Sequence, residues 1–300
     1  MNASISVVFS HNMVAPAQGY VSPSAAKPAQ VVADWQQAGL PLRLTEPTAA
    51  TLGELCLAHS RNFVDSVMTL RQPNGFGTTC PNVARSLPYT TGAMLTAARL
   101  AVAGEPIVAA PCSGFHHASW DRASGFCTFN GLAVTALRLL EEGSASRVGI
   151  LDCDMHWGDG TDAILRRLGR PRSIVHFSAG EKYFQPQQVP EFFKELTAIL
   201  SGMAGCDVVL YQAGADPHID DPLGGWMTTR QMAMRDRMVF TALRDLGVPV
   251  VWNLAGGYQR DAGGSIEPVL QIHRNTAREH ARALSFNANG GDENLAGDAV

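Results

Sequence analysis

Acidic, imidazole and phenol side chains follow four short apolar runs in this chain. The four runs and the groups after them are residues 107–111 before His116 and His117, residues 148–151 before Asp152, Asp154 and His156, residues 207–211 before Asp216, and residues 248–253 before Tyr258. If the runs are parallel strands, all four groups emerge at the carboxyl edge of one sheet, where open α/β proteins place their active sites. The pattern favours a metal-dependent hydrolase.

The segment from Asp152 to His156 has the spacing of a metal site. In an extended segment, alternate side chains point to one side, so Asp154 and His156 can reach the same cation. Asp216 would supply a third ligand from another strand end, which leaves a coordination position open for water, as in catalytic zinc sites. Taken alone, an Asp-x-Asp-x-His segment is equally typical of a solvated turn.

The pair His116-His117 could supply acid–base chemistry. Neighbouring residues in regular structure point apart, so both rings can face one site only through an irregular turn, which Gly114 permits. A histidine titrating near neutrality can take a proton from water and return it to a leaving amine. Asp152 and Asp159 are the carboxylates available to orient the two rings. Without such partners, a His-His pair is usually a surface feature.

Tyr258 follows two glycines at the end of the fourth run. A phenol on such a loop can donate a hydrogen bond to the oxyanion of a tetrahedral intermediate. Glycines after a strand are also ordinary turn formers, so this segment predicts little by itself.

Composition limits the class of protein. The 300 residues are 46% hydrophobic and 17% charged, which is typical of a globular protein with a substantial core. The formal charge of −4 gives no support for a nucleic-acid partner. The six cysteines include no Cys-x-x-Cys pair, which favours reduced thiols over a disulfide framework or a thiolate metal site. Neither a signal peptide nor a membrane span is predicted, so we expect a cytoplasmic protein without a membrane partner.

The order of elements predicts an α/β fold. Further strands are expected at residues 4–9 and 173–177. Helices are expected at residues 92–103, 130–142, 161–168, 190–203, 228–246 and 268–284. This alternation predicts a mostly parallel central sheet with helices on both faces, hence a three-layer αβα architecture. The candidate site residues run from 116 to 258, so we expect one domain over residues 1–284 and a flexible tail over residues 285–300. Residues 16–28 are expected to form a loop.

Five segments in this order resemble the histone deacetylase and acetylpolyamine amidohydrolase family, which has the arginase/deacetylase fold. The matching segments are Gly114-Phe115-His116-His117-Ala118, Gly125-Phe126-Cys127-Thr128-Phe129-Asn130, Asp152 to Thr161, Gly214-Ala215-Asp216 with Asp221-Pro222-Leu223-Gly224, and Gly256-Gly257-Tyr258. The segment from Gly114 to His117, which is Gly-Phe-His-His, resembles that of the class IV branch. Most members of the family have Pro-Gly-His-His there instead.

The resemblance implies a role for each residue of the site. Asp154, His156 and Asp216 would hold Zn²⁺, or Fe²⁺ as in some members. His117, oriented by Asp159, would be the general base and then the general acid. His116, paired with Asp152, would be its electrostatic partner. Tyr258 would polarise the scissile carbonyl.

The resemblance also implies a substrate tunnel and a second ion. Gly125 and Phe126, with Phe184 or Tyr183, would wall the tunnel for the alkyl chain of the substrate. Ser178-Ala179-Gly180 and Asp152 align with a structural K⁺ site, although Gly180 replaces the usual histidine. Leu223 stands where polyamine-selective members have an acidic residue, which counts against a polyammonium substrate.

The expected function is therefore removal of an acyl group, acetyl or longer, from an N-acyl-lysine or a similar small amine. An acetylpolyamine or other small-molecule deacylase is the alternative. A binding module without catalysis would lack a ligand, His117 or Tyr258, and all are present. A two-metal ureohydrolase of the arginase type would need more carboxylate ligands than the strand ends supply. Acyl length, metal identity and oligomeric state are left open.

Other residues are expected to have no role in the site. Met227, Met234 and Met238 have helical spacing and are expected in the core. His59, His218, His273 and His280 have no supporting pattern and are expected at the surface. Trp226 is expected near the rim of the site.

Overall fold

Seven parallel strands form one sheet in the described part of the chain. The computed structural model describes residues 4–16 and 22–286. The strands are β1 (Ile5–Val8), β2 (Leu42–Thr45), β3 (Ile107–Ala110), β4 (Val148–Asp152), β5 (Ile174–Ser178), β6 (Val208–Gly214) and β7 (Val250–Ala255), and their order across the sheet is β2-β1-β3-β7-β6-β4-β5. Every neighbouring pair is parallel. The carboxyl ends of all strands therefore meet at one edge.

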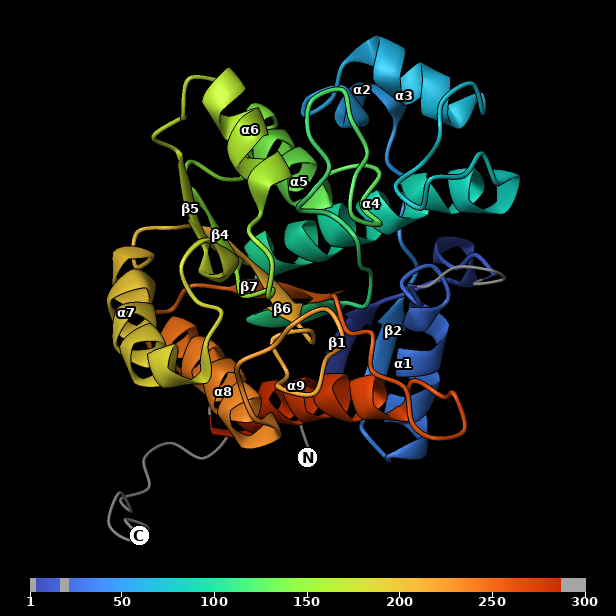
Figure 1. Ribbon diagram of the computed structural model, residues 1–300. Coiled ribbons are helices and arrows are strands. Elements are labelled where there is room, and N and C mark those ends of the chain that lie inside the picture. The colour runs from blue at the N-terminus through green and yellow to red at the C-terminus, as the bar shows by residue number, and fades with distance from the viewer. Residues whose placement is uncertain (1–3, 17–21, 287–300) are drawn as a thin grey trace, which may run out of the picture.

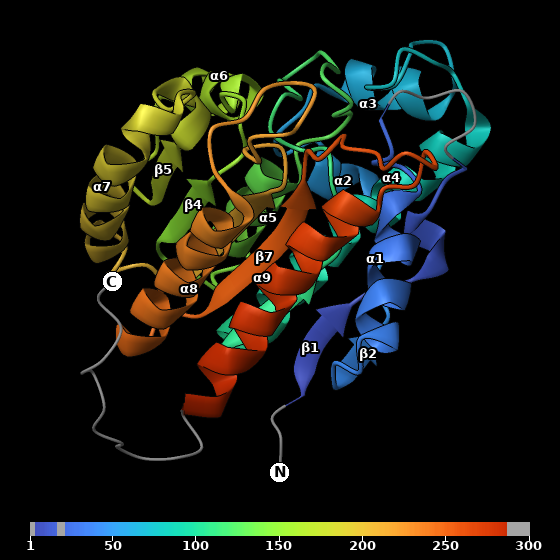
Figure 2. The ribbon, with the colours of Figure 1, turned by 60° about the horizontal axis from the view of Figure 1, so that its bottom comes forward.

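Helices cover both faces of this sheet (Figures 1 and 2). The helices are α1 (Lys27–Gln37), α2 (Leu52–Leu55), α3 (Arg61–Met68), α4 (Pro81–Val102), α5 (Gly131–Glu141), α6 (Asp159–Arg167), α7 (Val189–Gly202), α8 (Thr229–Asp245) and α9 (Glu267–Phe286). Figure 1 shows α4, α5 and α6 on one face and α1, α7, α8 and α9 on the other. The predicted three-layer architecture with a parallel central sheet is confirmed.

The central strands are buried on both faces. All residues of β4, β6 and β7 are buried. Helices pack on each side of them, so neither face can carry alternating polar residues, and the strands are continuous apolar runs. That property made them visible in the sequence.

The N-terminal third differs from the prediction. Strand β2 and helices α1, α2 and α3 were not expected, and α4 begins at Pro81 rather than at residue 92. Pro88 lies inside α4, where it cannot donate the usual helical hydrogen bond. Part of the loop expected at residues 16–28 and most of the tail expected at residues 285–300 lie outside the described residues; α9 extends to Phe286. None of the helices in the described ranges could span a bilayer.

Several residues expected to be peripheral are buried, and one expected in the core is exposed. Trp226, expected near the rim, is 1% exposed and packs against Tyr183 and Phe192. Met227 is buried as predicted, but Met234 is 42% exposed, because the face of α8 that carries it is turned away from the sheet.

The four histidines expected at the surface are all buried, so that prediction is wrong: His59, His218, His273 and His280. His59 is satisfied by two backbone groups, since Nδ1 bonds the carbonyl of Ser119 and Nε2 accepts the N–H of Asn130. His280 accepts a hydrogen bond from the indole of Trp252. Isolated histidines carry no periodic signal, so the sequence could not distinguish these structural roles from surface positions.

Because these histidines are buried, we expect the protein to lose stability in acid. Burial lowers the pKa of His59 to about 4 and that of His280 to about 3. In the unfolded chain both bind a proton below about pH 6.5, so the unfolded state gains protons first as the pH falls. We expect the free energy of unfolding to decrease by up to about 1.4 kcal/mol per pH unit and per histidine between about pH 6 and pH 4. Urea denaturation across this range measures the slope.

His59→Gln removes one titrating group. It should therefore reduce the slope by up to about 1.4 kcal/mol per pH unit, which corresponds to one proton. The exposed His11 provides the matched control, and His11→Gln should leave the slope unchanged. An identical pH dependence in the parent protein and in His59→Gln would contradict the assignment.

Candidate active site

The candidate residues lie together at the carboxyl edge of the sheet. Asp152 is in register with Gln212 of β6, and Gln212 is in register with Asn253 of β7. Beyond this row the three central strands end within a few residues of one another. Their following segments, which carry Asp154, Asp216 and Tyr258, therefore start from neighbouring positions.

Asp154, His156 and Asp216 form a group that could hold a metal ion. One ligand atom from each lies within 4.8 Å of the others. Nδ1 of His156 is 3.2 Å from Oδ1 of Asp154 and 3.1 Å from Oδ2 of Asp216. Two ligands at about 2.1 Å from a tetrahedral ion are separated by about 3.4 Å, so these spacings fit one shared cation. No other group of three or more His, Cys, Asp or Glu residues with this spacing occurs among residues 4–16 and 22–286.

The electrostatics of this group favour a bound cation. The side chains of Asp154 and Asp216 are almost completely buried. Burial and the adjacent Asp154 carboxylate raise the pKa of Asp216 to about 7. Hydrogen bonds to the two carboxylates raise the pKa of His156 to about 10. A divalent ion could take the place of the proton that His156 and the two carboxylates share, and it would neutralise both carboxylates at once. The residues present therefore fit a metal ion.

Each of the paired histidines has its own carboxylate. His116 Nδ1 is 2.9 Å from Asp152 Oδ2, and His117 Nδ1 is 2.6 Å from Asp159 Oδ1. The two rings lie 4.1 Å apart, so the irregular turn expected after Gly114 brings both toward one site. A carboxylate at Nδ1 fixes the tautomer in which Nδ1 carries the proton, and Nε2 of His117 is then available as a base.

The two imidazoles have different proton affinities. Burial opposes protonation of His116, but the carboxylates of Asp152 and Asp154 outweigh it and raise its pKa to about 9. Burial and the neighbouring His116 lower the pKa of His117. Divergent pKa values of this kind separate an electrostatic partner from a proton acceptor.

Tyr258 lies on a loop that hydrogen bonds hold in place. Its backbone N–H donates to Oδ2 of Asp221 at 2.8 Å, and Oδ1 of Asp221 accepts the N–H of Leu223. Burial, with the carboxylates of Asp216 and Asp154, raises the pKa of Tyr258, so its hydroxyl stays protonated and can donate. Asp221 belongs to a matched motif, yet its role as support for this loop was not predicted.

Lys27 is a buried cation that was not among the predicted site residues. Its side chain is fully buried, and Nζ donates to the carbonyl of Gly256. Burial lowers its pKa to about 8, although Asp216, Asp154 and Asp221 oppose this shift. Lys27 begins a helix about 200 residues away in sequence from the loop that it contacts, and no local pattern marks it.

The site lies at the base of a small hollow. It opens between the histidine pair, Asp154, His156 and Tyr258. Phe126 lines it and packs against Tyr258, with ring centroids 5.7 Å apart. Gly125 has φ +53°, and a Cβ there would lie 2.4 Å from the His117 ring. Glycine therefore lets the loop of Phe126 approach the base.

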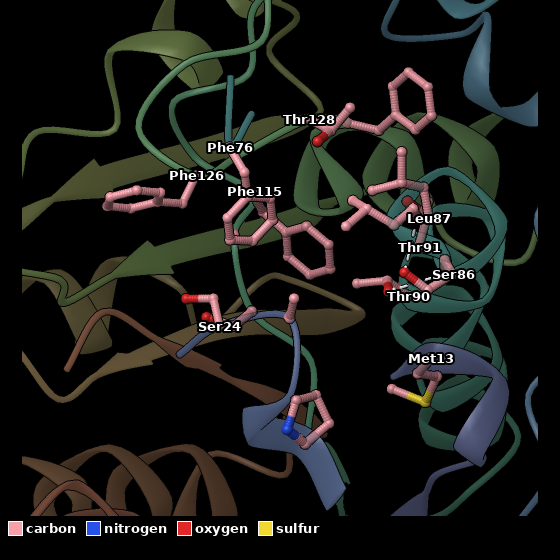
Figure 3. A pocket seen from close by; sticks show the side chains of 16 residues that line it. Met13, Ser24, Phe76, Ser86, Leu87, Thr90, Thr91, Phe115, Phe126 and Thr128 are labelled. Atoms are coloured by element: carbon pink, nitrogen blue, oxygen red, sulfur yellow. Dashed lines mark hydrogen bonds between the residues drawn. The ribbon is translucent and has the colours of Figure 1, made fainter. Parts of the chain in front are cut away.

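A second hollow adjoins the first (Figure 3). It shares Ser24, Ser113, Gly114, Phe115 and Phe126 with the site. Figure 3 shows Phe115 and Phe126 on one side of this space and Leu87 and Thr90 of α4 on the other. Its lining is mixed, with phenyl rings beside hydroxyl groups.

The remaining predicted substrate residues do not line the site hollow as the structure describes it. Phe184 is 54% exposed and Leu223 is 45% exposed. Tyr183, the alternative to Phe184, is buried against Phe192 and Trp226. Contact of Phe184 or Leu223 with substrate therefore stays a prediction.

The predicted K⁺ site also stays a prediction. Asp152 is in register with Ser178, whose hydroxyl accepts the N–H of Gly158. A Cβ at Gly180 would lie 2.2 Å from the carbonyl carbon of His156. This contact explains why a side chain is absent there.

Comparisons with known proteins agree with this geometry. The sequence profile of the histone deacetylase domain matches residues 23–188. An uncharacterized protein of Picosynechococcus sp. is 30% identical over 211 residues, covering 64% of this chain and 69% of that protein. Histone deacetylase 6 of Caenorhabditis elegans is 28% identical over 192 residues, which cover 53% of this chain but only 20% of that protein. The crystal structure of acetylpolyamine aminohydrolase from Burkholderia pseudomallei has the same fold, with a TM-score of 0.72 at 19% identity, covering 92% of this chain and 98% of that one.

Gly256 provides a test of the metal group. It has φ +49°, and an added Cβ would lie 2.1 Å from Cγ of Asp216. We expect Gly256→Ala to displace this carboxylate and to raise the dissociation constant for Zn²⁺ at least tenfold, measured by competition with a chelating dye.

Gly264→Ala is the matched control, because Gly264 also has a positive φ, +80°, but no atom within 4 Å of an added Cβ. It should show similar backbone strain, of about 1–3 kcal/mol, and unchanged zinc affinity. Equal zinc affinities in Gly256→Ala and the parent protein would contradict a ligand role for Asp216.

Proposed function

The chain belongs to the histone deacetylase domain family, and from that membership we propose that it is a metal-dependent amidohydrolase. It removes an acyl group, acetyl or longer, from the amine of an N-acyl-lysine or a similar molecule. The observation that carries the proposal is that a carboxylate-bound histidine and a partly buried phenol line one hollow with Asp154 and His156 of the metal-binding group. The closer likeness to the class IV branch remains part of the proposal.

Asp154, His156 and Asp216 are the proposed metal ligands. Two carboxylate oxygens and one imidazole nitrogen suit Zn²⁺ and also Fe²⁺. When bound, such a cation would polarise the amide carbonyl and make a water molecule more acidic. The three residues leave space for solvent and substrate on the side of the hollow, where His156 is 36% exposed.

His117 is the proposed general base and general acid. Asp159 holds its Nδ1–H, so Nε2 can accept a proton from the attacking water and then deliver it to the departing amine. The lowered pKa keeps His117 neutral before the reaction, as a base requires. His116, held by Asp152, contributes positive charge next to the developing negative charge.

Tyr258 is the proposed oxyanion donor. Its protonated hydroxyl faces the same hollow as His117, and Asp221 fixes its backbone. A preorganised donor needs no rearrangement as charge develops on the carbonyl oxygen. Gly125 and Phe126 would form the wall beside the substrate chain, with Phe184 and Leu223 nearer the solvent.

Metal removal is the first test. Chelation should abolish hydrolysis of acetyl-lysine peptides, and one equivalent of Zn²⁺ or Fe²⁺ per chain should restore it.

Asp154→Asn should bind metal more weakly and lose activity. Asp207→Asn should retain both, because Asp207 is an exposed carboxylate that bonds only the backbone N–H groups of Ser146 and Arg147. Full activity after chelation would refute the proposal, and a stoichiometry of two would favour the ureohydrolase alternative.

Removal of one hydroxyl tests the oxyanion donor. Tyr258→Phe should lower kcat by about 10²–10³, with little change in metal content, because the lost hydrogen bond strengthens only in the transition state. Tyr183→Phe removes a hydroxyl that bonds Glu195 instead, and should leave kcat unchanged. A kcat of Tyr258→Phe within about twofold of the parent value would remove Tyr258 from the mechanism.

A further inference from the structure

Arg235 is a fully buried cation on α8, outside the residues assigned above. Helix α8 lies on the face of the sheet opposite to α4 and α5 (Figure 1). The side chain of Arg235 extends toward the ends of β4 and β6, which precede the proposed metal ligands.

One nitrogen of Arg235 binds both of these strand ends. Nη1 donates to the carbonyl oxygen of Cys153 at 3.0 Å and to that of Gly214 at 2.9 Å. Cys153 directly precedes Asp154, and Gly214 lies two residues before Asp216. The guanidinium thus joins the backbone of the two segments that carry the carboxylate ligands.

The bridge lies just beyond the last registered pair of β4 with β6, although Gly214 still pairs with Ala255 of β7. The register of β4 with β6 ends at the pair Asp152 and Gln212, and Cys153 N–H donates to the carbonyl of Gln212. Beyond this point the segments approach closely, since a Cβ on Gly214 would lie 2.5 Å from Cα of Asp154. Close approach brings two buried carboxylates together, which is unfavourable before a cation binds.

Other side chains fix the guanidinium in turn. Nε of Arg235 donates to Oδ1 of Asp236 at 2.9 Å. Asp236 also accepts the hydroxyl of Tyr211 and, through Oδ2, the hydroxyl of Thr276 at 2.6 Å. The planar fork of arginine is therefore held between a carboxylate and two backbone carbonyls.

We propose that Arg235 is a positioning residue, which holds the Asp154 and Asp216 segments at the separation that one metal ion requires. This inference rests on the proposed function. A buried ion pair adds little net stability compared with apolar side chains of the same size. Stabilisation of the fold alone therefore does not explain why Nη1 of Arg235 donates to both of these carbonyl oxygens.

The test compares Arg235→Lys with Tyr211→Phe. Lysine retains the charge but has a shorter reach and no planar fork, so it cannot bridge both carbonyls while it binds Asp236. Tyr211→Phe removes one hydrogen bond to Asp236, but Thr276 and Arg235 still bond this carboxylate, so the contacts of Arg235 with the two carbonyls should stay in place. For each protein we would measure the Zn²⁺ dissociation constant by chelator competition, the Tm with and without Zn²⁺, and kcat and KM separately.

Arg235→Lys should raise the Zn²⁺ dissociation constant by about 10- to 100-fold and reduce the rise in Tm on adding Zn²⁺. Its kcat at saturating zinc should fall, with KM little changed. Tyr211→Phe should lower the Tm of the metal-free protein and retain the zinc affinity and kcat of the parent. If Arg235→Lys does not fold, Arg235→Gln, which can still donate to one carbonyl, replaces it in the same measurements.

Parent-like zinc affinity in the Arg235 variant would overturn the inference. Equal losses of affinity in the Arg235 variant and Tyr211→Phe would also overturn it, as would failure of both Arg235 variants to fold, since the role would then be structural. Absence of zinc binding by the parent protein would instead reject the proposed function itself.

Discussion

The structure depends on two buried carboxylates and a partly exposed imidazole that lie within 4.8 Å of one another. In water, such a group would separate. Here it cannot, because Asp154 and Asp216 emerge from adjacent strands of one sheet, and the register of those strands determines where each emerges. The parallel sheet supplies the convergence, and the charges must then be compensated locally. Backbone N–H groups of Met155 and His156 donate to these carboxylates and supply part of that compensation.

Cations and close backbone contacts supply the rest. Lys27 and His116 both interact electrostatically with Asp154 and Asp216, and both are buried. Gly125 and Gly256 let backbone approach His117 and Asp216 more closely than any side chain would allow. Buried charges are tolerated when they are paired and hydrogen-bonded, and a divalent ion completes this pairing. Without a cation this arrangement is electrostatically unfavourable, and for the same reason it favours the binding of one.

The sequence predicted the central sheet and the convergence of the candidate side chains at its edge, because both leave strong local signals. Strands buried on both faces are continuous apolar runs, and the residues after them are the ones that converge. The edge strand β2 is largely exposed and carries no such run, so it was missed. Pro88 lies within α4, so the sequence of the first half of this helix did not have a helical pattern. Lys27 and Arg235 were missed for another reason: each acts on a backbone carbonyl distant in sequence, and such contacts leave no motif. His59 and His280 were placed at the surface, since burial of a single histidine depends on tertiary neighbours.

The central claim is that Asp154, His156 and Asp216 share one divalent ion. Anomalous diffraction from crystals of the zinc-loaded protein, measured on both sides of the zinc absorption edge, tests it directly. We expect one strong peak about 2.0–2.2 Å from Nδ1 of His156 and from a carboxylate oxygen of each aspartate. A peak bound elsewhere, or none at this position in fully loaded protein, would show that the three residues do not share one ion.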